Sequence, residues 1–393
     1  MPADKKSNNK NRGRLLILYF LGLLLAVSVA LPAYIQSNFL NQFIGIKTVS
    51  LFFVVANLLT VVAILFFPHL IKKLTNYFLT QAVLILYAVS LLGLSLSAGA
   101  TVALLSLIIF SITSNLIWIN MDIMVENFSV DASTGRTRTI YFTFINAGWI
   151  LSPLFSVYLI GKGEYNLTFL VAGFLVIPFF LIFLNQAKKL KDKIKYQKET
   201  LLATIKRTWK RKNLRGIFFI ALLLQLFYSS AVIYIPLHLF QDLKMSWEIL
   251  GPIFSFMLIP FILLEIPAGI LADKYLGEKE LLFTGFAILA ISLFLFYYIK
   301  TPTVWIWAAV LFASRVGAAL VEAMRETFFF KIVDAKDVGC INVFRTTGPL
   351  AYVLGSTLAI ITLSFFSLNY LFLVLAIIML SGFIFTASLK DTK

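Results

Sequence analysis

The chain has 393 residues, of which 60% are apolar and 13% charged, whereas an ordinary soluble domain is about 45–50% apolar and about 25% charged. A water-soluble fold of this length could not bury so much apolar surface, because single cores stop growing at roughly 250–300 residues. The net charge of +16 lies in short segments between long apolar runs, which argues against a nucleic-acid groove. The composition therefore predicts an integral membrane protein in a lipid bilayer, with no nucleic-acid partner.

Twelve apolar runs are long enough to cross a membrane, since about 20 helical residues span the hydrocarbon layer. Helices are expected because runs of this length satisfy their backbone polar groups internally only as helices. The uncharged stretch 346–389 is too long for one helix and is divided at 364–369, where Ser and Asn interrupt it. The predicted spans are 15–36, 48–70, 77–98, 101–126, 140–162, 165–186, 215–241, 247–272, 280–299, 303–328, 341–363 and 368–388.

Basic residues mark one side of these predicted helices. The loops on the opposite side hold little more than Lys47, Lys162, Lys244 and Lys300. Nearly all other Lys and Arg lie in the N-tail 1–14, the loops 71–76, 127–139, 273–279 and 329–340, the segment 187–214 and the C-tail 389–393. Because Lys and Arg are enriched in cytoplasmic loops, both termini are predicted to be cytoplasmic, in a bacterial-type inner (plasma) membrane.

The longest predicted loop, 187–214, separates an N-terminal six-helix half, 15–186, from a C-terminal half, 215–388. Apolar residues recur in this basic segment at near-helical spacing. Two interpretations stay open: an amphipathic helix on the anionic inner leaflet, or a solvated linker.

The two halves repeat each other at a shift of 200 residues. Asp122 then aligns with Glu322, and Glu126 aligns with Glu326. Two parallel six-helix repeats joined by a linker are the architecture of one large class of transporters. The sequence thus predicts an all-α membrane protein built from two pseudo-symmetric six-helix bundles.

A motif lies between the eighth and ninth predicted helices and consists of Gly269, Asp273, Lys274, Gly277 and Lys279. It resembles the loop signature of the major facilitator superfamily, with one extra residue between Asp273 and Gly277. The loop 71–76, where that signature is more usual, lacks its Gly and Asp. Helix number, central linker and internal repeat extend the resemblance over nearly the whole chain.

The resemblance implies two bundles that rock about a central cavity, and a monomer. It also implies that Asp273 holds one half against the other in the outward-open state. Arg136 and Arg138 are the partners that the sequence offers for this carboxylate.

Several ionisable residues lie inside predicted spans, where a charge costs about 2.5–3.5 kcal/mol at the helix centre. Arg315 is expected either to bind an anionic group of the solute or to pair with Glu265 or Asp122. Glu265 is the favoured proton-coupling residue. Asp122 and Glu322 are assigned to coupling or gating, with gating favoured, and Glu126 and Glu326 to charge networks at the membrane interface with Arg325, Arg136 or Arg345.

Polar stripes occur on three of the four helices that line the cavity in the resembled family. Asn115, Trp118, Asp122 and Glu126 are three or four residues apart and share one helix face. The seventh and tenth helices carry similar stripes. The predicted solute contacts are Asn115, Trp118, Gln225, Tyr228, Ser229 and Arg315.

We therefore expect a secondary transporter that moves a small solute by alternating access, with proton coupling as a hypothesis. Direct ATP drive is not expected, because the chain has no G-x-x-x-x-G-K-[ST] loop. With one cysteine and two distant histidines, it is expected to have no metal site, no cofactor and no enzymatic activity. A membrane-embedded lipid-modifying enzyme and a non-transporting receptor or scaffold remain alternatives.

Overall fold

The computed structural model describes residues 2–128, 134–160, 165–186, 201–333 and 338–390. The side chains of Glu126, Glu265, Asp273 and Lys274 lie outside the described part. All regular structure in these ranges is helical, and twelve candidate spans are long and apolar enough to cross a membrane. The predicted fold class is thus confirmed.

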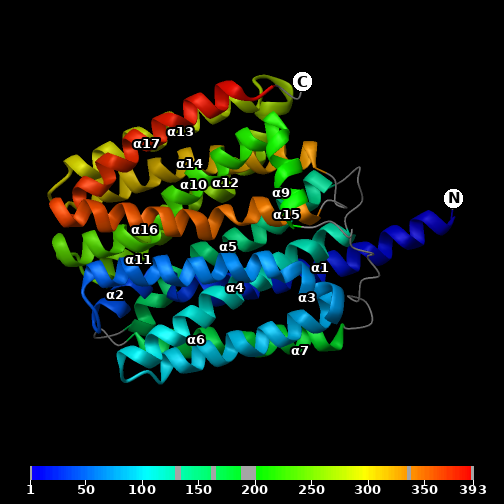
Figure 1. Ribbon diagram of the computed structural model, residues 1–393, viewed down its shortest axis with the longest axis horizontal. Helices are drawn as coiled ribbons and strands as arrows, with labels where there is room; N and C mark the ends of the chain where they lie inside the picture. The colour runs from blue at the N-terminus through cyan, green and yellow to red at the C-terminus, as the bar shows by residue number, and fades with distance from the viewer. Residues whose placement is uncertain (1, 129–133, 161–164, 187–200, 334–337, 391–393) are drawn as a thin grey trace.

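The first half of the chain forms six of the candidate spans. Its helices are α1 (Pro2–Ala33), α2 (Gln36–Asn41), α3 (Ile46–Ser95), α4 (Ala100–Phe128), α5 (Thr134–Ile160), α6 (Asn166–Phe174) and α7 (Val176–Asn185). The helix α3 contains two spans, Ile46–Phe67 and Asn76–Ser95, and folds back on itself between them (Figure 1). The predicted loop 71–76 does separate these two spans, although the helical hydrogen bonding of α3 continues through it.

The second half forms the other six spans. Its elements are α9 (Leu201–Lys210), α10 (Lys212–Leu237), the π-helical turn η2 (His238–Asp242), α11 (Trp247–Phe256), α12 (Ile259–Lys274), α13 (Glu278–Tyr298), α14 (Val304–Ile332), α15 (Val338–Arg345), α16 (Thr347–Phe365) and α17 (Asn369–Ser388). The predicted division of 346–389 is confirmed, because α16 ends at Phe365 and α17 begins at Asn369.

Two predicted spans of this half are each broken into two helices. The break between α11 and α12 precedes Pro260, which has no backbone N–H to donate and clashes with the carbonyl four residues earlier. The break between α15 and α16 falls at Thr346, two residues before Gly348-Pro349. Both breaks lie next to the cavity described below.

The two halves form two helix bundles side by side, and both termini lie at one end of the molecule (Figure 1). We call this the terminal end and the opposite one the far end. The bundles meet mainly where α3 packs on α16 and α5 packs on α11. These contacts leave α1, α4, α10 and α14 near the middle, where they line a cavity together with α3, α5 and α16.

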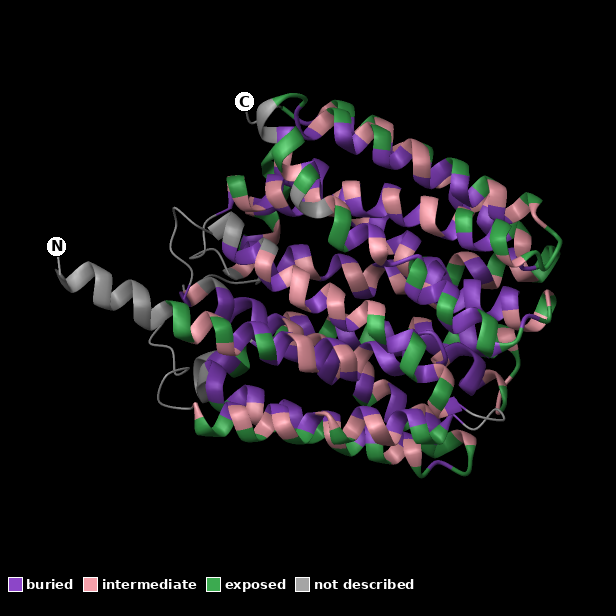
Figure 2. Cartoon of the chain, turned by 180° about the vertical axis from the view of Figure 1, so that it is seen from behind, coloured by how far each residue is buried: buried purple, intermediate pink, exposed green. Residues whose placement is uncertain are grey.

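Many large apolar residues are exposed on the bundles, and exposed residues follow the outer helices in Figure 2. Ile384 in α17 is 70% exposed and Leu263 in α12 is 59% exposed. In water such a surface would be unstable, whereas in a bilayer it faces lipid tails. Trp305 and Tyr298, both strongly exposed, stand at the far end, where aromatic rings favour the membrane interface.

The described part of the linker is a short amphipathic helix, α9. Thr204 and Thr208 are buried on one face of α9, while Lys206 and Lys210 are exposed on the other. A wholly solvated linker is therefore wrong for 201–210. The remainder of the predicted linker, 187–200, lies outside the described residues.

Of the two glycines in the predicted loop motif, only Gly277 has a backbone conformation that requires glycine. Gly277 has φ of 143° and ψ of 162°, a region essentially restricted to glycine. Gly277→Ala is therefore expected to lower stability by about 1–3 kcal/mol, measured as thermal unfolding in detergent. Gly269→Ala is the matched control, because nothing lies within 4 Å of the added Cβ in α12; it should cause no loss. Equal stability of both variants would contradict the prediction.

Candidate functional site

A cavity lies between the bundles and has two adjoining lobes, of about 370 Å³ and about 250 Å³. Both lobes are lined by Trp149 from the first bundle and by Gln225, Glu322 and Tyr352 from the second. Such volumes suit a small molecule. The cavity is shared between the two units that would move relative to each other in alternating access.

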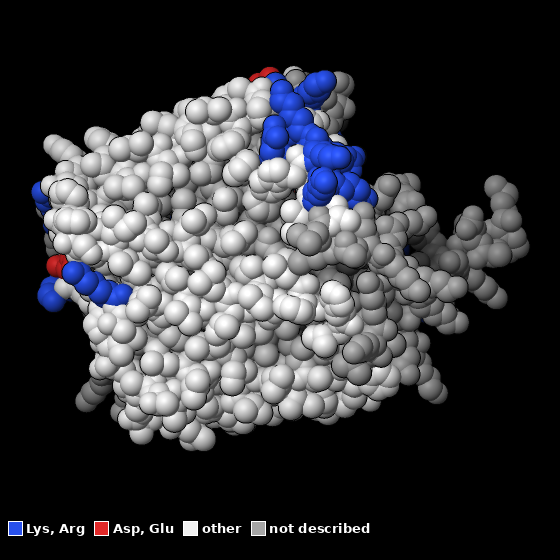
Figure 3. Space-filling view, viewed as in Figure 1, with Lys and Arg blue, Asp and Glu red and all other residues white. Residues whose placement is uncertain are grey.

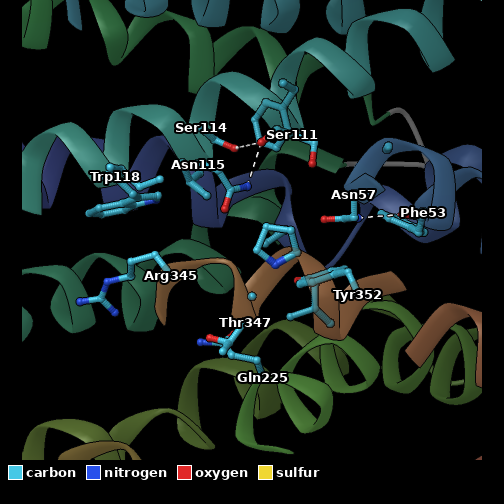
Figure 4. Close-up of a pocket in the computed structure, with 18 of the residues that line it drawn as sticks. Phe53, Asn57, Ser111, Ser114, Asn115, Trp118, Gln225, Arg345, Thr347 and Tyr352 are labelled. Carbon is cyan, nitrogen blue, oxygen red and sulfur yellow. Dashed lines mark hydrogen bonds between the residues drawn. The ribbon is translucent and has the colours of Figure 1, made fainter. Parts of the chain in front are cut away.

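Along α3 and the middle of α4, the wall of the larger lobe carries uncharged polar side chains, whereas Asp122 of α4 gives it a charge near the terminal end. Asn115 donates to the Ser111 carbonyl at 2.8 Å, and Asn57 donates to the Phe53 carbonyl at 2.9 Å. These bonds hold both amides at the wall and leave their carbonyl oxygens available (Figure 4). Trp118 lies one turn along α4 from Asn115, and Gln225 and Thr347 face this helix from the second bundle.

The smaller lobe contains Arg315, near the middle of α14. Its side chain is 2% exposed, its Nη1 donates to Ser314 Oγ at 3.2 Å, and its guanidinium lies 4.9 Å from the centroid of the Phe227 ring. It also interacts with the hydroxyl of Tyr34. Among the described side chains, no carboxylate lies within ion-pair distance of Arg315. A buried cation without a carboxylate is costly, so the smaller lobe favours an anionic group.

A buried ion network closes the cavity toward the terminal end. Asp122 Oδ1 pairs with Arg138 Nη1 at 2.8 Å, and Asp122 Oδ2 lies 3.1 Å from Arg345 Nε. The second contact is an ion pair without hydrogen-bond alignment, because Arg345 Nε has no aligned acceptor. Asp122 belongs to α4, Arg138 to α5 and Arg345 to α15, so this carboxylate ties the bundles together.

The network continues through α14. Arg345 forms two hydrogen bonds with the Glu326 carboxylate, at 2.9 and 3.2 Å. Arg325 Nη2 lies 3.1 Å from Glu326 Oε1 and 3.3 Å from Glu322 Oε1. The Tyr228 hydroxyl donates to Glu322 Oε2 at 2.7 Å. Among the described side chains, three carboxylates thus match three arginines, and the chain of contacts ends at the cavity wall.

Neutral groups close the cavity toward the far end. The Tyr234 hydroxyl donates to Ser50 Oγ at 2.9 Å, and Gln241 Nε2 donates to Asn38 Oδ1 at 3.1 Å. The Tyr34 ring stacks on Phe254, with ring centroids 5.0 Å apart. Each contact joins one bundle to the other, so described contacts connect the bundles on both sides of the cavity.

The structure places the predicted solute contacts unequally. Asn115, Trp118, Gln225, Tyr228 and Arg315 line the cavity. Ser229 does not line either lobe, so its predicted place on the cavity wall is wrong, and its contact with the solute stays a prediction. Its hydroxyl donates to the carbonyls of Leu226 and Ala351, because one residue beyond Tyr228 turns the side chain about 100° around the helix, toward α16.

The predicted coupling and gating residues are only partly described. Asp122, Glu322 and Glu326 all belong to the ion network, and Glu326 pairs with Arg325 and Arg345 as the sequence suggested. Asp122 pairs with Arg138 and Arg345, which excludes it as the partner of Arg315. The predicted roles of Glu126, Glu265, Asp273 and Lys274 concern side chains outside the described part, so those roles stay predictions.

Sequence reasoning missed several residues at this site. Asn57 and Tyr352 line the cavity without belonging to a polar stripe. Glu278, within the loop motif, is 2% exposed and its Oε1 lies 2.6 Å from Lys331 Nζ. A carboxylate at the first residue of α13 is favoured by the helix dipole, and this signal in the sequence could have identified it.

Comparison with known proteins agrees with this arrangement. Residues 15–264 and 217–392 match the Major Facilitator Superfamily. The chain belongs to the major facilitator superfamily. A solved structure of this fold, the crystal structure of a POT family transporter in complex with 5-aminolevulinic acid, has a TM-score of 0.77 and 13% sequence identity, with 96% of this chain and 95% of that chain covered. No curated protein matches the sequence.

Membership of this superfamily confirms the transporter prediction. The protein is a multi-pass membrane protein that moves a small solute by secondary transport, with alternating access between its two bundles. A lipid-modifying enzyme and a receptor or scaffold are not favoured. The central cavity is the candidate solute site, since helices of both bundles line it.

Proposed function

We propose that the transported solute carries an anionic group and that this group binds Arg315. The observation that supports the proposal is a charge imbalance. Arg138, Arg325 and Arg345 are matched by three carboxylates, whereas Arg315 has none among the described side chains. A carboxylate or phosphate can accept two parallel hydrogen bonds from a guanidinium, and it would replace the missing counter-charge.

The remainder of the solute is proposed to be a neutral, polar body in the larger lobe. Asn57, Asn115 and Gln225 offer amide groups there, and Trp118 and Trp149 offer flat apolar faces. Amides fix orientation by hydrogen bonding, and aromatic rings pack against the apolar face of a ligand. The solute would then contact both bundles at once, which is what coupling of binding to rocking requires.

The test is the thermal stability of the purified protein with a panel of anionic, zwitterionic, cationic and neutral metabolites. A ligand at 100 times its dissociation constant stabilises the native state by about 2.7 kcal/mol. The largest upward shift in melting temperature is expected among solutes with a carboxylate or phosphate. Stabilisation by neutral or cationic solutes only would reject the anionic assignment, and transporter membership would stand.

We further propose that Glu322 couples transport to protons. It lines both lobes, accepts from Tyr228 at 2.7 Å and contacts Arg325 of the ion network. Protonation would remove one negative charge from a network whose described members carry equal charges of both signs. The network that ties the bundles together would thereby respond to the protonation state of a residue at the cavity wall.

Glu322→Gln is expected to abolish uptake driven by an imposed pH gradient while solute exchange across proteoliposomes continues. The amide keeps the shape of the side chain but cannot take up a proton. Glu280→Gln, at an exposed carboxylate of α13, is the matched control and should leave both activities unchanged. If the Glu322 variant still responds fully to the pH gradient, proton coupling through this residue is wrong.

We also infer that the terminal end faces the cytoplasm of a bacterial-type cell and that the protein acts as a monomer. Lys and Arg gather at the terminal end, with a smaller group at the far end (Figure 3). Lys and Arg flanking membrane helices favour the cytoplasmic side. Protease added to intact cells should leave a tag on either terminus uncut. Cleavage of the tag would show that the terminal end faces the outside of the cell.

A further inference from the structure

A basic surface covers α9 and the first turn of α10. Its exposed basic residues are Lys206, Lys210, Arg211, Lys212 and Arg215, with Lys390 beside them. None of them has a carboxylate within ion-pair distance among the described residues. Figure 3 shows a band of Lys and Arg side chains near the place that α9 has in Figure 1. None of these residues lines the central cavity.

The basic surface stands at the edge of the lipid-facing wall. Trp209 is 38% exposed, and its ring packs on Phe218 and Phe219 of α10, at 5.2 and 5.8 Å between ring centroids. Phe219 stacks on Phe385 of α17, the helix that exposes Ile384 to lipid. A partly exposed tryptophan beside lysines is typical of a helix at the boundary of headgroups and acyl chains.

The opposite face of α9 holds α15. The Thr208 hydroxyl lies 3.1 Å from the Cys340 sulfur, and Thr204 packs so closely on Gly339 that an added Cβ would come within 2.7 Å of it. Arg211, at the junction with α10, donates to the Ile332 carbonyl at the end of α14. The last residue of α15 is Arg345, which joins both bundles in the ion network.

We propose that α9 and the start of α10 form a docking surface for anionic phospholipid headgroups, and that docking keeps α9 against α15. The charge of the surface is complementary to phosphate-bearing lipids, and Trp209 places it at the depth of the headgroups. Anionic lipid thereby stabilises the position of α15 in which Arg345 contacts Asp122. The lipid composition of the leaflet then sets how firmly the terminal end is closed.

Cys340 is a native probe of this contact, since it is the only cysteine of the chain and is 1% exposed beneath α9. We would measure its alkylation rate by a maleimide in nanodiscs of phosphatidylcholine, with and without phosphatidylglycerol. Each lysine near an anionic surface contributes about fivefold to binding, so three lysines contribute up to about 100-fold. Phosphatidylglycerol is expected to slow alkylation by about tenfold or more, and high salt should reverse the effect.

Matched variants assign the effect to the surface. The triple variant Lys206→Gln, Lys210→Gln and Lys212→Gln should lose the slowing, and the corresponding triple Lys→Arg variant should keep it. The control variant replaces three exposed lysines at the far end, Lys47, Lys244 and Lys300, by Gln. Its alkylation should be slowed by phosphatidylglycerol as in the native protein.

Several outcomes would overturn the proposal. Equal alkylation rates in the two lipid compositions would do so, as would persistence of the slowing in the Lys→Gln variant of α9. Slowing by inorganic phosphate or soluble polyphosphate in phosphatidylcholine discs would instead assign the surface to a soluble anion. Because alkylation is read without any transported solute, these results are independent of the solute assignment.

Discussion

Arg315→Gln is expected to abolish stabilisation by the anionic solute while leaving the protein without solute at least as stable as before. Truncating one partner of a buried charged pair costs about 2–5 kcal/mol of binding, roughly 30-fold to several thousand-fold in affinity. In the protein without solute, by contrast, the substitution removes a buried cation that lacks a described carboxylate and so removes a desolvation cost. If Arg315 had only a structural role, its replacement would instead lower the stability of the protein without solute.

The measurement is thermal unfolding of native and variant protein with and without the stabilising solute. Arg315→Lys should bind the solute with intermediate affinity, because an ammonium keeps the charge but cannot make the bidentate contact. Arg211→Gln, at an exposed arginine remote from the cavity, should respond as the native protein does. A variant at position 315 that is destabilised but keeps the full response to solute would make Arg315 a packing residue.

The overall fold could be predicted from the sequence because its signals are local. Apolar length and loop charge specify the spans, and the division between α16 and α17 followed from Ser and Asn at 364–369. The basic segment 71–76 correctly separated two spans, but that it is itself helical was not predicted. The breaks before Pro260 and Gly348 had a signal in the sequence, since both residues weaken helices. They were not predicted, because the spans were assigned from the length of the apolar runs only.

The site was predicted only in part, because its geometry depends on contacts between remote segments. The stripe of α4 correctly placed Asn115 and Trp118 on the cavity wall, since helical periodicity decides which residues share a face. Nothing local indicates that Arg345, more than 200 positions away, contacts Asp122. For the same reason Ser229 was misplaced: the face of α10 that meets α16 is decided by packing between the helices.

The contacts that close the two ends of the cavity differ in chemistry. This difference suits a carrier whose cavity opens alternately to the two sides of the membrane. The far end is closed by hydrogen bonds between neutral groups, such as Tyr234 with Ser50, and such bonds contribute about 0.5–1.5 kcal/mol each. The terminal end is closed by buried charges, which are costly once separated. Opening the terminal end therefore requires either solvation of the network or a change in its charge, and protonation of Glu322 is such a change.

Asp122→Asn and Arg345→Gln are each expected to lower stability by about 2–4 kcal/mol, somewhat less than for a fully buried pair, because the Arg345 side chain is 19% exposed. Each single variant leaves the described members of the network with unequal charges, three of one sign against two of the other. The double variant keeps Arg138 and Arg325 against Glu322 and Glu326, and so restores the balance. It should therefore be more stable than the sum of the single effects predicts.

Thermal unfolding of the four proteins gives the coupling energy, expected at about 0.5–3 kcal/mol for residues in one network. Glu280→Gln combined with Arg345→Gln is the control pair, since the exposed Glu280 carboxylate belongs to no described ion pair, and its effects should add. Additive effects for Asp122 and Arg345 would mean that their contact does not hold the bundles together. A positive coupling would show that the terminal end is closed by charge balance across the bundles, which is the property that a proton at Glu322 could alter.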